Sequence, residues 1–133
     1  MANGTEDIRN MINKIYHIAD VHIRNVKRHK EYRQVFRRLY SYIKKTKTEN
    51  DLIYVAGDIV HAKTDMSPEL VDLTSEFFAN LADLLPTIVI LGNHDCNLNN
   101  NYRLDALSPI VKAIKHKNLH YLKDNGVYNI QGV

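Results

Sequence analysis

Cysteine is nearly absent from this sequence of 133 residues, since Cys96 is the only one. A disulfide within the chain is therefore excluded, and the composition fits a reducing compartment, either cytoplasmic or nuclear. A run of about 18 or more apolar residues is also missing, so we expect neither a transmembrane helix nor a membrane partner. The first residues are polar and lack the apolar stretch of a secretory signal, so secretion is not expected.

The sequence contains no internal repeat, and its short asparagine run is the nearest approach to low complexity. With 133 residues, 44% of them hydrophobic, the chain is long enough for one domain with its own core. We therefore expect a polar lead-in over residues 1–12 and a single domain over residues 13–133.

Acidic residues are scarce between Arg24 and Lys47, where Glu31 stands alone against ten basic residues. This segment carries a net charge of +9, so the rest of the chain carries −6 to give +3 overall. Such asymmetry is typical of a protein with a phosphate-rich partner, although a solvated helix face is the alternative. The residues chosen as candidates for binding nucleic acid are Arg24, Lys27, Arg28 and Lys30.

The order of the apolar runs predicts an α/β protein. Strands are predicted over residues 14–19, 52–56, 87–91, 119–122 and 127–130, and helices over about 29–47, 68–85 and 108–116. The last two helices each begin at a Ser-Pro pair, a cap followed by a proline in the first turn. Asn125-Gly126 predicts a hairpin between the last two strands. The alternation of strands and helices predicts a parallel sheet with right-handed crossovers.

Polar side chains follow the first three predicted strands at the point where each strand ends. The three motifs are Asp20-Val21-His22, Gly57-Asp58 and Gly92-Asn93-His94-Asp95. The carboxyl ends of parallel strands share one edge of a sheet, and α/β proteins bind ligands there. Carboxylate, amide and imidazole groups are ligands for Mn²⁺, Fe²⁺ and Zn²⁺. A single such motif is usually a turn or a helix cap, but three in succession favour a metal site.

The spacing also indicates how the ligands could be shared between two ions. Strand alternation turns Asp20 and His22 to the same side, so both could hold one ion, while Asp58 on the adjoining strand could bridge two. Two ions about 3.5–4 Å apart clamp a phosphate and activate a water. His94, beside Asn93, could then protonate the leaving oxygen as a general acid.

Together the three motifs resemble the first three signature motifs of the calcineurin-like metallophosphoesterases. Within that superfamily, residues 18–22 and 57–61 resemble the SbcD-type nucleases of DNA double-strand-break repair. The resemblance covers roughly residues 13–131. It implies an α/β, metallophosphoesterase-like sandwich with helices on the outside, of which this chain would hold the N-terminal βαβαβ portion. It also implies metal-assisted hydrolysis of phosphodiester bonds, most plainly those of DNA.

The resemblance implies a set of metal ligands. Asp20 and His22 would bind the first ion, Asp58 would bridge both ions, and Asn93 would bind the second. Mn²⁺ is the usual metal of the nuclease branch, with Fe²⁺, Zn²⁺ and Mg²⁺ as alternatives. A partner ATPase subunit or a homodimer is a further implied association.

Three other residues receive catalytic roles from the same resemblance. His94 would act on the leaving group or the scissile phosphate, and Asp95 would orient His94. His61 matches a histidine that lies near the substrate phosphate in the nuclease branch.

One departure from the family pattern concerns the later histidines. The family completes its site with a lone histidine and a Gly-His-x-His motif, whereas His116 and His120 here lack that context and are expected to be structural. We therefore expect the domain to lack its C-terminal half, with weak metal affinity and little hydrolysis by this chain alone. Robust Mn²⁺-dependent cleavage of DNA by the 133-residue chain would contradict that expectation.

Two alternatives to a nuclease stay open at this point. One is a phosphatase or cyclic-nucleotide phosphodiesterase of the same superfamily, against which His61 and the +9 segment weigh. The other is a non-catalytic module that binds nucleic acid or a protein. Replacement of Asp58 by asparagine distinguishes an enzyme from a binding module. It abolishes activity in either kind of enzyme but leaves DNA affinity nearly intact in a binding module.

Overall fold

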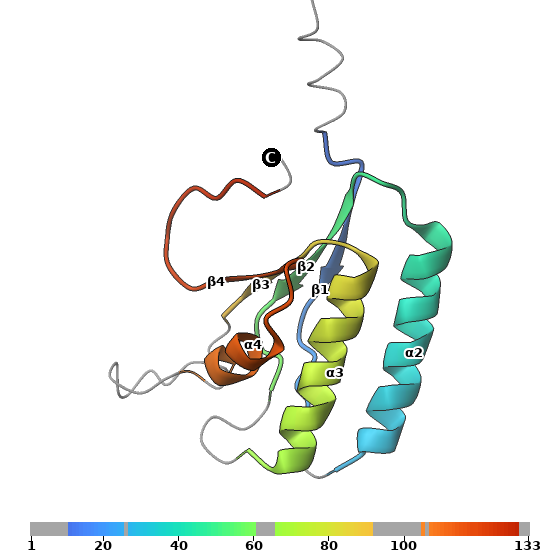
Figure 1. Cartoon of the computed structure of the whole chain (residues 1–133). Coiled ribbons are helices and arrows are strands. Elements are labelled where there is room, and N and C mark those ends of the chain that lie inside the picture. The colour runs from blue at the N-terminus through green and yellow to red at the C-terminus, as the bar shows by residue number, and fades with distance from the viewer. Residues whose placement is uncertain (1–10, 26, 61–65, 92–104, 106, 131–133) are drawn as a thin grey trace, which may run out of the picture.

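The computed structural model describes residues 11–25, 27–60, 66–91, 105 and 107–130. These residues form three helices and four strands (Figure 1). In chain order the elements are β1 (Lys14–Ile18), α2 (His29–Thr46), β2 (Asp51–Ala56), α3 (Pro68–Leu84), β3 (Thr87–Ile90), α4 (Ser108–Ile114) and β4 (Leu119–Leu122). None of the helices in this described part combines the length and apolarity needed to cross a membrane.

The four strands form one sheet in the order β1-β2-β3-β4, and every neighbouring pair is parallel. Helices α2 and α3 run side by side along this sheet, and α4 lies next to α3 (Figure 1). The predicted α/β class with a parallel sheet is therefore confirmed. Because all strands point the same way, the loops that follow β1, β2 and β3 leave from one edge.

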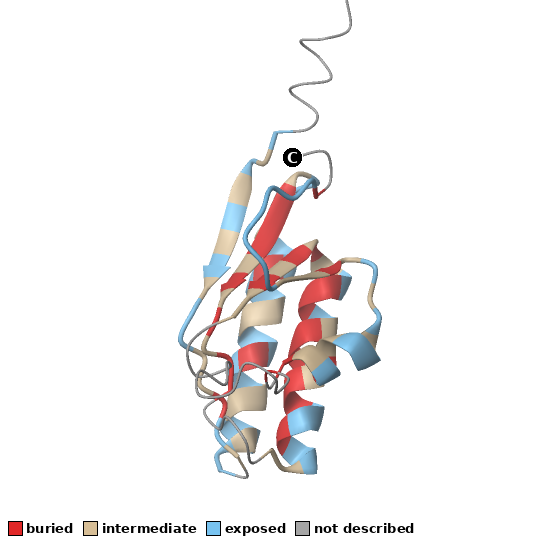
Figure 2. Ribbon diagram, turned by 90° about the vertical axis from the view of Figure 1, so that its left-hand side faces the viewer, coloured by how far each residue is buried: buried red, intermediate tan, exposed pale blue. Residues whose placement is uncertain are grey.

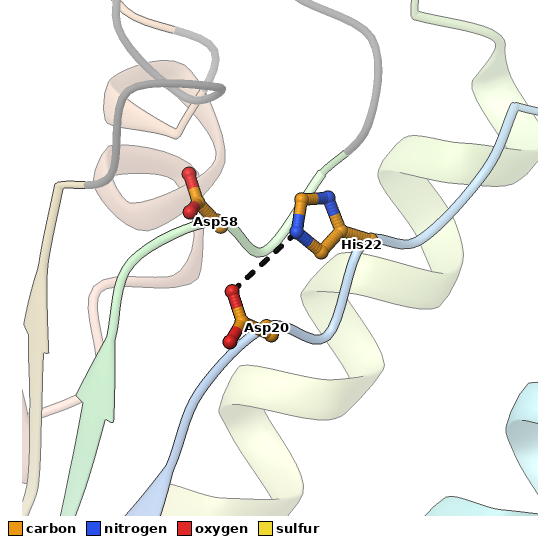
Figure 3. A group of neighbouring side chains, drawn as sticks. All are labelled: Asp20, His22 and Asp58. Atoms are coloured by element: carbon orange, nitrogen blue, oxygen red, sulfur yellow. Dashed lines mark ion pairs between the residues drawn. The ribbon is translucent and has the colours of Figure 1, made fainter.

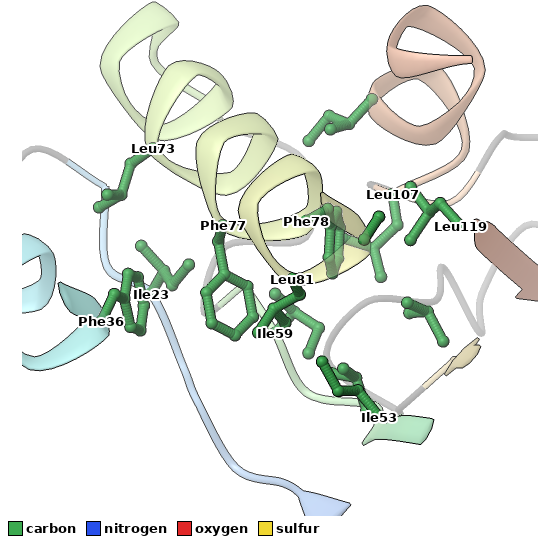
Figure 4. Packing of buried hydrophobic residues seen from close by; sticks show 14 of the residues in the cluster. Ile23, Phe36, Ile53, Ile59, Leu73, Phe77, Phe78, Leu81, Leu107 and Leu119 are labelled. Carbon is green, nitrogen blue, oxygen red and sulfur yellow. The ribbon is translucent and has the colours of Figure 1, made fainter. Parts of the chain in front are cut away.

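Helix α3 supplies more buried hydrophobic residues to the core than any other described element. Its N-terminus is capped by the hydroxyl of Ser67, which accepts a hydrogen bond from the backbone N–H of Leu70 at 3.1 Å, as the Ser-Pro pair predicts. Phe77 and Phe78 are fully buried, and the ring of Phe77 packs against Phe36 of α2 with centroids 4.4 Å apart. Figure 4 shows these rings together with the buried residues of the sheet and its loops. The buried residues accordingly gather along α3 and β2 (Figure 2).

Helix α2 is amphipathic, as its sequence predicts, but its apolar stripe is narrower than expected. Phe36 and Ile43 are buried, and Tyr32 and Leu39 are half-buried. The spacing of Tyr32, Val35, Phe36, Leu39 and Ile43 at i, i+3, i+4, i+7 and i+11 predicts that Val35 belongs to the same stripe, yet it is 57% exposed. The reason is geometric: β1 is the edge strand of the sheet that the described residues form, so none of its other strands extends beneath this side of the helix.

The predicted fifth strand over residues 127–130 is wrong. Residues 127–130 are irregular, and the hydroxyl of Tyr128 donates to the carbonyl oxygen of Asp124 at 2.6 Å, which closes a loop. Ile130 is instead buried and lines a groove with Leu52 and Ile88, on strands of the sheet. Burial of this one aliphatic side chain outweighs the local preference of Asn125-Gly126 for a hairpin turn.

The start of α4 also differs from the prediction that Ser108 is its cap. Ser108 is the first helical residue, and the carboxylate of Asp105 accepts hydrogen bonds from the backbone N–H groups of Leu107 and Ser108 at 3.0 and 2.7 Å. Leu107 is the N-cap and makes no side-chain cap, so the carboxylate of Asp105, two residues earlier, satisfies these N–H groups in place of the predicted Ser108. At the other end, the Nε2 of His116 donates to Asp83 of α3 at 2.8 Å, since its Nδ1 already accepts the N–H of Asn118. His116 thus joins α4 to α3, which agrees with a structural role.

Candidate metal centre

The loops after β1 and β2 bring three predicted metal ligands together. Asp20 and His22 lie in the first loop, and Asp58 lies in the second. One ligand atom from each side chain lies within 4.8 Å of the others, and Figure 3 shows the three side chains facing one another. Nε2 of His22 lies 3.6 Å from Oδ1 of Asp20.

This donor set fits a divalent cation. Ligand atoms about 2.1 Å from one ion lie roughly 3.0–3.5 Å apart when they occupy neighbouring positions. The observed 3.6 Å between His22 and Asp20 needs only a small inward rotation of the side chains. The side chain of Asp20 is 79% exposed and that of His22 is 32% exposed, so solvent and a small substrate can reach the centre.

All three candidate ligands, Asp20, His22 and Asp58, have left-handed backbone conformations. The φ angles are 51° for Asp20, 47° for His22 and 52° for Asp58, and Gly57 has a φ of 68°. A non-glycine residue in this region costs about 1–2 kcal/mol, and such residues cluster at functional sites. The backbone therefore holds strain at the positions where the candidate ligands sit.

Backbone hydrogen bonds between the two loops maintain this strained arrangement. The N–H of His22 donates to the carbonyl oxygen of Asp58 at 2.9 Å, and the N–H of Ile23 donates to that of Ile59 at 2.7 Å. Ile23 and Val60 then pair in an isolated parallel bridge. The residues that directly follow His22 and Asp58 are thus hydrogen-bonded or paired with the other loop.

Buried side chains anchor the paired loops to the core. Ile23, Ile59 and Val60 are fully buried, and Figure 4 places Ile23 and Ile59 beside the phenylalanines. From α2, the hydroxyl of Tyr32 donates to the carbonyl oxygen of His22 at 2.8 Å. The sequence offered a partial signal for these anchors, because apolar residues directly follow both polar motifs. The hydrogen bond of Tyr32 had no such signal, since that residue was assigned to the apolar stripe of the helix.

We expect replacement of Gly57 by alanine to lower the free energy of unfolding by about 1–2 kcal/mol, because a Cβ is disfavoured at a φ of 68°. Urea unfolding followed by circular dichroism measures this loss. Gly126→Ala is the matched control, because a Cβ there would meet the ring of Tyr128 at an ordinary 3.6 Å. Equal stability of the two variants would show that Gly57 is not needed for its loop.

The residues predicted to bind nucleic acid fall into two groups in the structure. Arg24 and Lys27 are exposed in the loop that follows His22, and Lys30 is exposed in the first turn of α2. Arg28 instead forms a paired contact with Glu31, through Nε at 2.8 Å and Nη2 at 2.6 Å. Its charge is therefore compensated within the helix start, which weakens its candidacy. The i,i+3 spacing of the two residues could have shown this from the sequence.

Four predicted site residues lie outside the described part of the chain: His61, Asn93, His94 and Asp95. Their catalytic and metal-binding roles stay predictions. His120 is described, and its Nε2 is buried without a hydrogen-bond partner among the described residues. His120 lies on β4, the edge strand on the opposite side of the sheet from β1. It is not among the described residues that converge at the candidate metal centre.

Two comparisons with known proteins bear on this centre. A protein of Acanthamoeba polyphaga mimivirus, described as the uncharacterized protein R555, is 49% identical over 130 residues. That alignment covers 96% of this chain but only 10% of the viral protein. Residues 13–133 match the model of the calcineurin-like phosphoesterases, and this match includes both loops that carry Asp20, His22 and Asp58. The chain belongs to the calcineurin-like phosphoesterase family.

Proposed function

We propose that this domain hydrolyses phosphodiester bonds of DNA with the help of divalent metal ions. The observation that carries the proposal is the convergence of Asp20, His22 and Asp58, each in a left-handed conformation, at the carboxyl edge of a parallel sheet. Family membership supports a metal-dependent hydrolase acting on phosphoester bonds. The choice of DNA and the number and identity of the ions belong to the proposal.

The described residues have distinct parts in this chemistry. Asp20 and His22 come from one loop and would hold one ion, while the two carboxylate oxygens of Asp58 allow it to bridge to a second. Divalent cations at this centre would supply Lewis-acid polarisation of the phosphoryl group and neutralise its charge. Mn²⁺ suits the mixed carboxylate and imidazole donors, and Fe²⁺, Zn²⁺ and Mg²⁺ are the ions to compare with it.

The remaining roles rest on the motif resemblance. Asn93 would bind the second ion, His94 would act on the leaving group or the scissile phosphate, and Asp95 would orient His94. His61, which follows the Gly-Asp pair in the second motif, lies near the substrate phosphate in the SbcD-type branch. We propose the same four roles here.

The choice of DNA over a phosphoprotein or a cyclic nucleotide is supported by charge. Arg24 and Lys27 are exposed within a few residues of His22, and the segment from Arg24 to Lys47 carries +9. A field of this sign raises the local concentration of a polyanion and favours a long phosphodiester over a small one.

A titration with Mn²⁺ followed by a panel of substrates tests the proposal. The electron paramagnetic resonance signal of free Mn²⁺ should fall as the chain binds the ion. Hydrolysis of DNA should depend on Mn²⁺ and exceed that of a chromogenic phosphodiester, a cyclic nucleotide and a phosphoserine peptide. Turnover is expected to be slow, because the sequence has no Gly-His-x-His motif. Metal-independent hydrolysis, or a preference for the phosphopeptide, would contradict the proposal.

A further inference from the structure

Helix α2 carries two kinds of basic side chain. Arg33 is held by α3, with Nη2 at 3.2 Å from Asp72 and Nε at 3.2 Å from Glu76. Five others are exposed and form no ion pair with an acidic side chain of the described residues. These five residues, called the α2 basic stripe below, are Lys30, Arg37, Arg38, Lys44 and Lys45.

The spacing of the stripe places its charges on one side of the helix. Lys30, Arg37 and Lys44 are seven residues apart, so they recur every two turns, about 10.5 Å along the axis. Arg38 and Lys45 repeat the same interval one residue later. The opposite side of α2 carries the buried Phe36 and Ile43. The stripe therefore faces away from the core along the helix that lies beside α3 (Figure 1).

The acids nearest to the stripe do not neutralise it. Asp72 and Glu76 of α3 already share Arg33, and Glu31 is already paired with Arg28. Polar Gln34 and Ser41 are exposed on the same side of the helix and can donate hydrogen bonds to phosphate oxygens. Tyr42, which is 60% exposed, flanks this side with an aromatic ring.

We propose that the α2 basic stripe binds the phosphate backbone of duplex DNA at a distance from the metal centre and without reading its sequence. From Lys30 to Lys45 the stripe spans about 22 Å, the length of roughly six base pairs at about 3.4 Å each. Arg24 and Lys27 continue the positive charge from the first turn of α2 to the loop of His22. A duplex would thus be held along the helix with one end directed toward the metal centre.

A lipid surface fits the stripe less well than a nucleic acid does. Surface helices that enter a bilayer bury an apolar face in the lipid. The apolar face of α2 is already used by the core through Phe36 and Ile43. Membrane contact would therefore be electrostatic only, whereas a duplex offers closely spaced phosphates along the whole stripe.

The test compares two triple variants of the full chain. One replaces the stripe residues Arg37, Arg38 and Lys44 by glutamine, and the other replaces Lys112, Lys115 and Lys117, which are exposed at α4 and just beyond it. Both variants lose three positive charges, so non-specific effects of net charge are matched. Affinity for a duplex of about 20 base pairs is measured by fluorescence anisotropy at several salt concentrations with EDTA present, so that bound metal does not contribute.

The stripe variant is expected to bind the duplex at least about 10-fold more weakly, with the slope of log K against log salt reduced by about 2.7 for three lost phosphate contacts. The α4 variant should stay within about 2-fold of the wild type. Equal losses in both variants, or no loss in the stripe variant, would overturn the proposal. So would a stripe variant that loses only its affinity for phosphatidylserine vesicles and keeps its affinity for DNA.

The proposal rests on the proposed function only for the identity of the nucleic acid. A failure of the stripe to bind DNA can be distinguished from a failure of the proposed hydrolytic function. Hydrolysis of a small chromogenic phosphodiester should be the same in the stripe variant and the wild type, because that substrate does not reach α2. Loss of DNA affinity with retained hydrolysis supports the stripe. Retained DNA affinity with metal-dependent hydrolysis overturns the stripe but leaves the proposed function standing.

Discussion

Replacement of Asp58 by asparagine is expected to weaken Mn²⁺ binding by at least about 100-fold and to remove metal-dependent hydrolysis. Loss of a residue that merely supports a ligand costs about 10–100-fold in metal affinity, and Asp58 is a candidate ligand itself. The substitution removes one negative charge and one of the two oxygens that would bridge the ions. Asparagine tolerates the left-handed conformation that Asp58 adopts at a φ of 52°, so the fold should survive.

The measurements are a Mn²⁺ titration by electron paramagnetic resonance and the rate of release from a chromogenic phosphodiester. Glu49→Gln is the matched control, because it removes one exposed carboxylate in the connection between α2 and β2. Urea unfolding should give the same stability for both variants within about 0.5 kcal/mol. Unchanged metal affinity in a well-folded Asp58→Asn chain would exclude Asp58 from the centre.

The same variant separates an enzyme from a binding module. If the domain only binds nucleic acid, DNA affinity persists in Asp58→Asn, and the wild type shows no metal-dependent hydrolysis to lose. If it is an enzyme, hydrolysis disappears from the variant while the α2 basic stripe still holds the duplex. Hydrolysis and DNA affinity, measured together, therefore decide whether the domain is an enzyme or a binding module.

Replacement of Asp105 by asparagine is expected to lower the free energy of unfolding by about 2–3 kcal/mol at pH 7. The Asp105 side chain is only 5% exposed and lies 3.0 Å from the ammonium of Lys123. Its oxygens also accept hydrogen bonds from the hydroxyls of Ser108 and Tyr121, both at 2.6 Å, and from two backbone N–H groups. An asparagine NH₂ group would face some of these donors and leave them without an acceptor.

The pH dependence of the difference gives a second check. Burial alone would raise the pKa of Asp105, but the hydrogen bonds from Ser108, Tyr121 and Lys123 outweigh it and lower that pKa from 3.8 to about 2. A carboxyl group with a lowered pKa stabilises the fold above its unfolded value and loses that contribution as the pH falls through its folded value. About 2 kcal/mol of stability should therefore disappear between pH about 5 and pH about 2.

Urea unfolding at several pH values follows this loss. The gap between wild type and Asp105→Asn should be widest near pH 7 and should close toward pH about 2, where Asp105 is itself becoming protonated. Asp124→Asn is the control, because Asp124 is exposed in the loop after β4 and its replacement should cost little. A gap that stays constant with pH would show that the charge of Asp105 contributes nothing to stability.

Local sequence signals predicted most of the fold. Helix α3 starts where Ser67-Pro68 placed it, and the parallel strands follow the apolar runs, because capping and periodicity act over a few residues. The hairpin predicted at Asn125-Gly126 is absent. The conformation of residues 127–130 depends instead on burial of Ile130 in a groove formed by strands far away in the sequence. Long-range burial of this kind cannot be derived from a turn dipeptide.

The candidate site was predictable in composition but not in conformation. The positions of Asp20, His22 and Asp58 directly after strands predict that they share one edge of the sheet, and the structure places them together. Their left-handed backbones are held by hydrogen bonds between loops that are far apart in the sequence. Such contacts exist only once the sheet has formed, so local patterns carry no sign of them.

The bridge between Ile23 and Val60 joins the described parts of the two loops that carry the candidate ligands. Their ordering entropy is spent during folding, so an arriving ion has little left to organise. Such a preformed cage favours ions by radius, because its ligands cannot spread freely to suit a larger one. We therefore expect the packing of the buried Ile23 and Val60 to influence which ion the candidate centre binds most tightly. We expect core substitutions at Ile23 or Val60 to alter the metal preference without removing any of the candidate ligands Asp20, His22 and Asp58.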